Sequence, residues 1–159
     1  MSTIAIIVAA GKGNRAGGKV PKQWRKIAGK LVIDWSIDAF KNHVLVDFVI
    51  VVLPPNKTLD RKDVITCAGG NSRSTSVYNG LVAAKNLSPD KVLIHDVARP
   101  AVSEDIITDI ILAIDEETGA APGLPISDAI WKVSDEEIEK TLDRNFIFRA
   151  QTPQGFPYS

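Results

Sequence analysis

Four short apolar runs, each followed by a glycine-rich or polar turn, constrain the fold of this chain most strongly. The runs are Ile4–Val8, Phe48–Leu53, Val64–Cys67 and Lys91–Ile94. Continuous apolar runs of this length are typical of strands that are buried on both faces of a parallel sheet. The sequence therefore predicts a sheet whose strands are joined by crossover connections.

Segments with helical spacing of apolar residues lie between these runs. The spacing predicts helices over Val32–Lys41 and Ser74–Lys85, and a third helix that begins after Ser103 as its N-cap. On the third helix we expect a buried face made of Ile106, Ile107, Ile110, Ile111 and Ile114. This alternation favours a three-layer, Rossmann-like α/β fold with a mainly parallel sheet, in which ligands bind beyond the carboxyl ends of the strands.

The pattern changes after Glu117 to short predicted strands: Gly119–Leu124, Ala129–Val133 and Phe146–Ala150. A polar turn is expected at Ser134–Glu137, and we expect a small β-arm at about 134–147. The 159 residues suit a single domain, 1–159. Because the sequence ends without a capped helix or a polar tail, we expect that a C-terminal segment is missing.

Charge and composition exclude several functional classes. Lys and Arg number 19, as do Asp and Glu, so the net charge of zero argues against binding nucleic acid or an anionic membrane through the overall field. No apolar run approaches the ~18–20 residues that span a bilayer. A single cysteine, Cys67, cannot form an internal disulfide, and no secretory leader is evident. We therefore expect a cytoplasmic protein.

A glycine-rich, basic segment follows the first predicted strand. It runs from Val8 to Gln23 and contains Gly11, Gly13, Lys12, Arg15, Lys19 and Lys22. Glycines let backbone N–H groups approach phosphate oxygens closely, and the cations add attraction for an anion. The segment predicts a phosphate-binding loop.

Three kinds of phosphate loop are compatible with parts of this segment. Gly11–Ala16 fits the dinucleotide fingerprint G-x-G-x-x-A, but Gly17, Gly18 and Pro21 oppose the helix that must open at once. Gly13–Lys19 spells a P-loop, yet Val20 stands where a magnesium-binding Ser or Thr is needed. The remaining interpretation is a long open loop around a nucleotide triphosphate, in which Arg15 and Lys22 stabilise charge at the phosphorus under attack.

Four motifs in order resemble a known family. They are Ala9–Arg15 with Pro21–Gln23, Gly69–Val77, His95–Pro100, and Asp143–Asn145 with Ala150–Gln154. The first is similar to the signature loop of sugar-phosphate nucleotidyltransferases, and together they resemble the 2-C-methyl-D-erythritol 4-phosphate cytidylyltransferases over essentially the whole chain. The resemblance implies the nucleotidyltransferase version of the α/β fold.

The resemblance also implies a CTP site. Arg15 and Lys22 match the two catalytic residues that stabilise the transition state at the α-phosphorus of CTP. The CTP-binding residues implied are Ala9, Ala10, Gly11 and Gly13 at the phosphates and Gly70, Asn71 and Ser76 at the base. Asn71 departs from the aspartate that many relatives carry.

Residues for Mg²⁺ and for the second substrate follow in the same way. Asp96 matches the metal ligand, Arg99 and Thr152 match residues that position the sugar-alcohol phosphate, and Arg144 matches an arginine that reaches this substrate across a homodimer from its β-arm. Ala129 replaces a threonine of relatives, and a later family segment, with an aspartate and a lysine, would lie beyond Ser159. His43 and His95 lack metal-ligand partners at suitable spacing, and we interpret His95 as structural.

The implied reaction is Mg²⁺-dependent transfer of a cytidylyl group from CTP to 2-C-methyl-D-erythritol 4-phosphate, which belongs to isoprenoid precursor synthesis. Ribitol 5-phosphate or another sugar phosphate is the alternative acceptor. A nucleotide-binding module that lacks catalysis is the alternative from a different class. Some family members continue into a cyclodiphosphate synthase domain, so a second enzymatic domain is also compatible with the resemblance.

Overall fold

A five-stranded sheet forms the centre of the protein in the computed structural model, which describes residues 1–11 and 20–158. Its strand order is β11 (Gln154–Pro157), β6 (Lys91–Asp96), β1 (Thr3–Val8), β4 (Phe48–Leu53) and β5 (Ile65–Ala68). The strands are parallel except β11, which pairs antiparallel with β6. The mainly parallel α/β sheet predicted from the sequence is confirmed.

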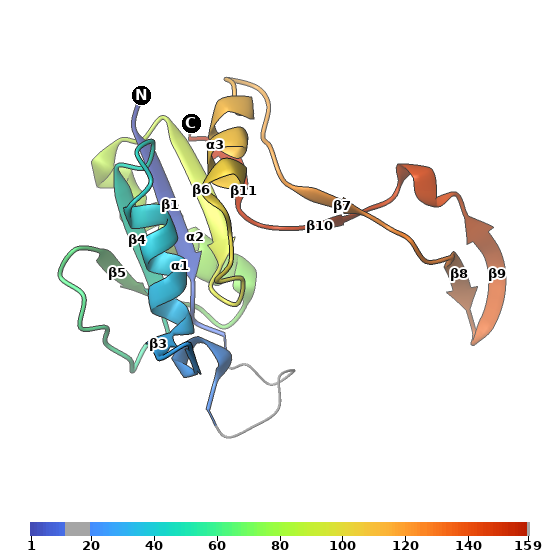
Figure 1. Ribbon diagram of the computed structural model, residues 1–159, viewed down its shortest axis with the longest axis horizontal. Coiled ribbons are helices and arrows are strands. Elements are labelled where there is room, and N and C mark those ends of the chain that lie inside the picture. The colour runs from blue at the N-terminus through green and yellow to red at the C-terminus, as the bar shows by residue number, and fades with distance from the viewer. Residues whose placement is uncertain (12–19, 159) are drawn as a thin grey trace.

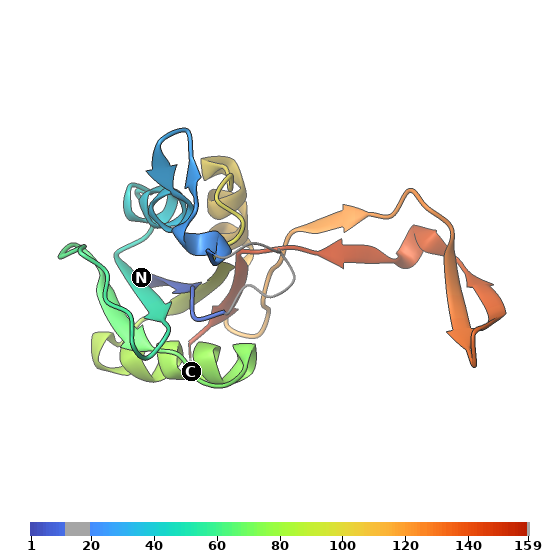
Figure 2. The same ribbon diagram turned by 90° about the horizontal axis from the view of Figure 1, so that it is seen from below.

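Helices cover both faces of this sheet. The helices α1 (Val32–Lys41) and α3 (Glu104–Ala113) lie on one face, and α2 (Arg73–Ala84) lies on the other, as Figures 1 and 2 show. Successive side chains of a strand point to opposite faces. Ile7 of β1 accordingly packs in the cluster under α1 and α3, while its neighbour Ile6 packs in the cluster under α2.

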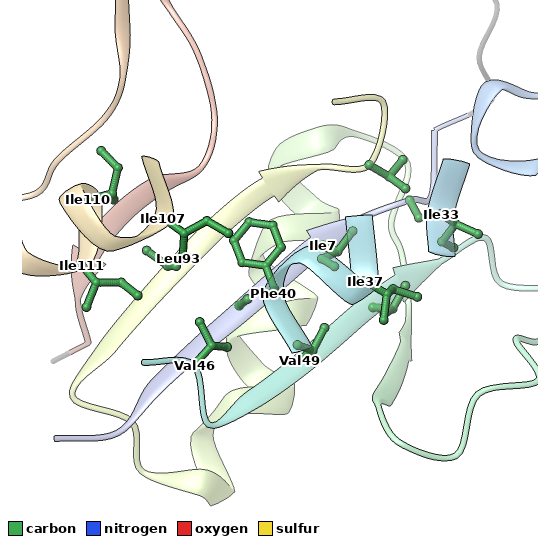
Figure 3. Close-up of a cluster of buried hydrophobic side chains, with 14 of the residues drawn as sticks. Ile7, Ile33, Ile37, Phe40, Val46, Val49, Leu93, Ile107, Ile110 and Ile111 are labelled. Carbon is green, nitrogen blue, oxygen red and sulfur yellow. The ribbon is translucent and has the colours of Figure 1, made fainter. Parts of the chain in front are cut away.

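The larger hydrophobic core lies between the sheet and the pair α1 and α3 (Figure 3). Phe40 of α1 is fully buried at its centre, between strand residues and the apolar face of α3. Other side chains drawn there are Ile7, Ile33, Ile37, Val46, Val49, Leu93, Ile107, Ile110 and Ile111. This core fixes the strands whose carboxyl ends carry the predicted site.

Most elements of the sheet and its helices agree with the prediction. The bounds of α1 and β4 are as expected, and Ser103 caps α3 by accepting a hydrogen bond from the backbone N–H of Ile106. The strand expected to end at Ile94 continues to Asp96. The prediction that Ile106 is buried was wrong, because its side chain is 38% exposed, whereas that of its neighbour Ile107 points into the core.

Several short elements differ from the prediction. A hairpin of β2 (Lys26–Ile27) and β3 (Lys30–Leu31) was not predicted, and neither was β11. Short 3-10 helices cover Lys22–Trp24, Lys85–Leu87 and Arg144–Phe146. Each of these elements is only two to four residues long. A segment this short shows no periodicity that a sequence pattern can reveal.

A projection of antiparallel strands, residues 123–150, extends away from the sheet and is called the arm below (Figure 1). At its base β7 (Gly123–Pro125) pairs with β10 (Phe148–Ala150), and at its tip β8 (Ile130–Ser134) pairs with β9 (Glu137–Leu142). The expected arm range, 134–147, lies inside it.

Three details of this part of the chain correct the prediction. The strand expected over Gly119–Leu124 is reduced to β7, with one bridge between Ala120 and Gly155 before it. The tip turn is confined to Asp135 and Glu136, both at positive φ, so Glu137 already belongs to β9, a six-residue strand that was not predicted. Phe146 belongs to a 3-10 helix and not to β10.

No helix in the described ranges is long and apolar enough to cross a membrane.

Candidate active site

The predicted site lies where the strand order of the sheet reverses. From β1 the chain first adds β4 and β5 on one side and then β6 on the other, so the switch falls between β1 and β6. In open α/β sheets ligands bind at the carboxyl ends of strands at such a point. Ala9 directly follows β1, and its N–H donates to the carbonyl of Val52 at 2.8 Å. Asp96 is the last residue of β6.

Gln23 joins the two described ends of the glycine-rich loop by hydrogen bonds. Its side-chain Nε2 donates to the carbonyl oxygens of Ala9 and Gly11, both at 2.9 Å, and the side chain is only 3% exposed. Lys22, the preceding residue, is exposed. Gln23 thus fixes Lys22 beside the start of the loop, a role that the motif Pro21–Gln23 did not reveal. Gly13 and Arg15 lie outside the described residues.

A second loop, Gly69–Ser72, packs directly on the first. A Cβ at Gly69 would lie 2.2 Å from the Cβ of Ala10, so only glycine permits this approach. The buried Ser76 hydroxyl accepts from the N–H of Gly70 at 3.1 Å and donates to the carbonyl of Ser72 at 2.9 Å. The structure therefore brings these CTP-binding candidates together at one edge of the sheet.

Asn71 lies exposed just before the N-terminus of α2. Ser72 caps this helix by accepting a hydrogen bond from the N–H of Thr75 at 3.0 Å. The first N–H groups of a helix carry a partial positive charge that favours acceptor atoms of a ligand. Asn71 consequently lies where hydrogen-bond acceptors of a base or a phosphate are favoured.

Asp96 is paired with an arginine that the sequence interpretation did not assign to the site. Arg73 Nε donates to Asp96 Oδ1 at 3.0 Å, and the Asp96 side chain is 35% exposed. Among the described residues there is no cluster of three or more His, Cys, Asp or Glu that would hold a metal ion.

Two of the three residues expected at the second substrate, Arg99 and Thr152, meet around His95. The guanidinium of Arg99 donates to the side-chain carbonyl of Gln151, and Thr152 is buried beside Asp96, whose N–H donates to the Thr152 hydroxyl at 3.3 Å. His95 itself is fully buried and contacts Arg99 and Thr152. Burial lowers the pKa of His95 to about 4, so its imidazole is neutral at pH 7.

Arg144 stands apart from all these residues. It lies in the short helix between β9 and β10, where its guanidinium donates to the carbonyl of Ser127. Figure 1 shows that this part of the arm is remote from the ends of β1 and β6. Within one chain, the structure does not bring Arg144 to the other candidates.

A cavity of about 790 Å³ lies beside the site without belonging to it. It opens between the β2–β3 hairpin, α1 and the segment before α3, and its lining includes Trp35, His43 and Pro100. None of the site residues predicted from the sequence lines it.

Comparisons with known proteins show the family to which this chain is similar. The family model for 2-C-methyl-D-erythritol 4-phosphate cytidylyltransferase (IspD) matches residues 3–159. The bifunctional enzyme IspD/IspF of Ruegeria sp. strain TM1040 is 44% identical over 163 residues, covering 99% of this chain and 43% of the relative. The 2-C-methyl-D-erythritol 4-phosphate cytidylyltransferase of Cereibacter sphaeroides strain ATCC 17023 is 41% identical over 166 residues, covering 99% and 74%.

A solved structure gives the same result. The crystal structure of 2-C-methyl-D-erythritol 4-phosphate cytidylyltransferase from Thermus thermophilus matches with a TM-score of 0.80 and 31% identity, covering 99% of this chain and 71% of that chain. The chain thus spans less than half of its bifunctional relative and about three quarters of the shorter one. The chain belongs to the family of 2-C-methyl-D-erythritol 4-phosphate cytidylyltransferases.

Proposed function

We propose that this chain transfers the cytidylyl group of CTP to 2-C-methyl-D-erythritol 4-phosphate, releasing pyrophosphate and forming 4-diphosphocytidyl-2-C-methyl-D-erythritol. The observation that carries the proposal is the contact of two loops at the switch point, where Gly69 packs on Ala10 beside the end of β6. The relatives span more than this chain, so the proposal concerns the portion that they share with it.

Both loops contribute to the proposed CTP site. Ala9, Ala10, Gly11 and Gly13 belong to the loop around the phosphates, in which Ala9 acts as an anchor because its own backbone groups bond to Val52 and Gln23. Gly70, Asn71 and Ser76 receive the base. The hydroxyl of Ser76 already bonds to Gly70 and Ser72, so its contribution is to shape the loop that reads the base. Base recognition then rests on backbone groups, which tolerate Asn71 in place of an aspartate.

The chemical step is an in-line displacement at the α-phosphorus of CTP. A phosphate oxygen of the acceptor forms the new O–P bond, and the bond from the α-phosphorus to the bridging oxygen breaks as pyrophosphate leaves. A phosphate oxyanion is nucleophilic without a general base, so the protein supplies positioning and positive charge. Arg15 and Lys22 supply that charge, and Gln23 holds Lys22 in place.

The residues at the end of β6 fit a magnesium ion held mainly by substrate phosphates. Mg²⁺ is usually bound through one or two carboxylates together with phosphates and water. Asp96, whose Oδ1 bonds to Arg73, would hold the ion through its carboxylate. When bound, Mg²⁺ neutralises charge on the phosphates.

The acceptor site joins residues of two chains in this proposal. Arg99 and Thr152 approach it from the sheet, and Arg144 comes from the arm of a second copy, since it is remote within its own chain. The arm carries exposed apolar side chains suited to such a homodimer: Trp131, Val133, Ile138, Phe146 and Phe148, exposed by 56, 54, 56, 84 and 58%. We place the enzyme in the cytoplasm, where the free thiol of Cys67 stays reduced.

Pyrophosphate release from the full-length protein tests this function. We expect release with CTP, Mg²⁺ and 2-C-methyl-D-erythritol 4-phosphate, and its loss in EDTA or with ATP in place of CTP. Faster release with ribitol 5-phosphate would identify the alternative acceptor. CTP binding without release from any acceptor would show a nucleotide-binding module and contradict catalysis.

A further inference from the structure

We propose that His95 is a positioning residue of this active site and not only a filler of the core. It holds the backbone of Arg99 and the side chain of Thr152, and through Thr152 it reaches the backbone of Asp96. The inference rests on the proposed function, which places those three residues around the acceptor and the metal. No catalytic contact between His95 and a substrate is implied.

The acceptor and donor chemistry of its partners fixes the tautomer of His95. The carbonyl of Arg99, 3.0 Å from Nε2, accepts only, so Nε2 carries the hydrogen. Nδ1 is then unprotonated and accepts from the Thr152 hydroxyl at 3.1 Å. The same hydroxyl oxygen accepts from the N–H of Asp96 at 3.3 Å. The hydrogen bonds therefore run in one direction, from Asp96 through Thr152 and His95 to Arg99.

This chain of hydrogen bonds joins two segments that are distant in sequence. Arg99 and Asp96 belong to β6 and its following turn, whereas Thr152 precedes β11. The imidazole is fully buried, and its ring centroid lies 4.8 Å from that of Phe40 at a tilt of 55°. Water cannot replace the lost partners at such a site without repacking, so removing His95 leaves Arg99 and Thr152 without their buried partner.

His43 provides a matched control within the same molecule. It is 4% exposed, its Nδ1 accepts from the N–H of Leu45 at 3.2 Å, and its Nε2 therefore donates to Thr108 Oγ1 at 3.0 Å. Tautomer and burial match those of His95, but none of its partners is a site residue. A purely structural histidine is expected to behave like His43.

Three substitutions separate the two halves of the hydrogen-bond chain. His95→Asn places a carbonyl oxygen near the Nδ1 position and keeps an acceptor for Thr152. His95→Gln places an amide N–H₂ near the Nε2 position and keeps a donor for Arg99. His95→Phe fills the volume beside Phe40 and removes both hydrogen bonds.

We expect kcat/KM for the acceptor substrate, 2-C-methyl-D-erythritol 4-phosphate, to fall about ten- to a hundredfold in His95→Phe and less in the Asn and Gln variants. The KM for CTP should change less than about twofold. The Mg²⁺ concentration that gives half-maximal activity should rise only in variants that lose the hydrogen bond between Thr152 and residue 95. Thr152→Val should reproduce part of the loss and add little to it in the double variant, because the two residues act through one hydrogen bond. His43→Phe should lower the melting temperature and leave both KM values unchanged.

Nitrogen NMR of the histidine rings gives a readout that does not depend on turnover. The chain has only two histidines, so the spectrum of His43→Phe assigns His95. We expect a protonated Nε2 and an unprotonated Nδ1. A protonated Nδ1, or folded His95→Phe with unchanged kinetics, would overturn the inference. If the wild-type protein releases no pyrophosphate, the proposed function is contradicted instead. The NMR spectrum of His95 would still show whether the chain of hydrogen bonds exists.

Discussion

The sheet and the arm of this molecule bury their side chains to very different extents. Residues 4–7 of β1 are completely buried, and Val51 and Val52 of β4 are as well. In β9 every residue except the half-buried Leu142 is exposed, and in β8 only Ile130 is partly covered. An isolated antiparallel pair is marginally stable in water. The sheet is thus stabilised by burial within the chain, whereas the strands at the tip of the arm bury little of their surface there.

Ion pairs do not compensate for the missing core of the arm. Lys132 and Glu139 pair across β8 and β9 at 2.6 Å, but both side chains are about half exposed. Exposed pairs of this kind contribute little to stability. In the proposed homodimer, the exposed apolar residues of the arm would therefore supply most of the binding energy. Two regions of one chain thus depend on different interactions, and each can be tested separately.

The largest expected effect is a difference in the free energy of unfolding between a substitution in the core under the sheet and one on the arm. Phe40→Ala should lower the free energy of unfolding by about 3–5 kcal/mol, because it leaves a cavity at the centre of the core. Urea denaturation followed by circular dichroism measures the change. Phe146→Ala on the arm, where the side chain is 84% exposed, is the control and should change stability by less than about 0.5 kcal/mol. Equal losses in both variants would mean that the arm has a core of its own.

Lys22→Ala tests the charge that the sheet edge provides to the reaction. Turnover should fall roughly 100- to 1000-fold while CTP affinity changes little, since the ammonium is expected to act mainly in the transition state. Steady-state pyrophosphate release and calorimetric CTP binding measure the two quantities. Lys26→Ala, four residues further along on exposed β2, is the matched control and should keep full turnover. Unchanged turnover in Lys22→Ala would remove Lys22 from the mechanism.

Acid should weaken the sheet through His95. The pKa of His95 is about 6.5 in the unfolded chain and about 4 in the folded one. Between these values the unfolded chain binds more protons, so stability is complete above pH 6.5 and is lost as the pH falls toward 4. The loss reaches about 3 kcal/mol. The free energy of unfolding, measured by denaturation in EDTA at several pH values, should fall with acid more in wild type than in His95→Phe. A difference between the two proteins that does not change with pH would contradict this prediction.

The same contrast explains how far the sequence alone predicts this structure. Helix α1 and strand β4 follow from periodicity, because their apolar faces are buried within the chain. Strand β9 was not predicted, and only its first residue, Glu137, had been assigned, as part of a turn. Its residues are exposed apart from Leu142, so they show no pattern of burial. Periodicity reports burial within the chain, so it gives little signal for a strand that its own chain leaves exposed.

The candidate site shows a related limit. The motifs led us to predict Lys22, Asp96 and Thr152 as site residues, since their residue types suit the expected chemistry. They did not identify Gln23 or Arg73, whose roles arise from contacts with Ala9, Gly11 and Asp96 in the fold. A contact between segments distant in sequence leaves no local signal in the chain. Supporting residues of a site are therefore visible only in the structure.

Arg144→Ala tests whether the arm completes the site of another copy. We expect kcat/KM for the acceptor phosphate to fall about ten- to a hundredfold with CTP affinity unchanged, since bidentate pairing with phosphate is lost. Co-expression with Lys22→Ala should restore about a quarter of wild-type activity, because half of the dimers are mixed and each mixed dimer has one intact site. Arg149→Ala, on β10, is the control arginine. Without recovery on mixing, Arg144 would not act across chains.

The smallest expected effect concerns the arm's apolar surface. Trp131→Ser should weaken the dimer by about tenfold, because an exposed aromatic side chain loses its partner contacts. Its melting temperature at concentrations where both proteins are monomeric should stay close to that of wild type, since Trp131 belongs to neither hydrophobic core cluster of the described residues. Analytical ultracentrifugation measures the dimer constant, and Tyr78→Ser on α2, 64% exposed, is the control. Equal dimerisation in Trp131→Ser and wild type would assign the arm's apolar residues another partner, and a lowered melting temperature would show that they stabilise the monomer after all.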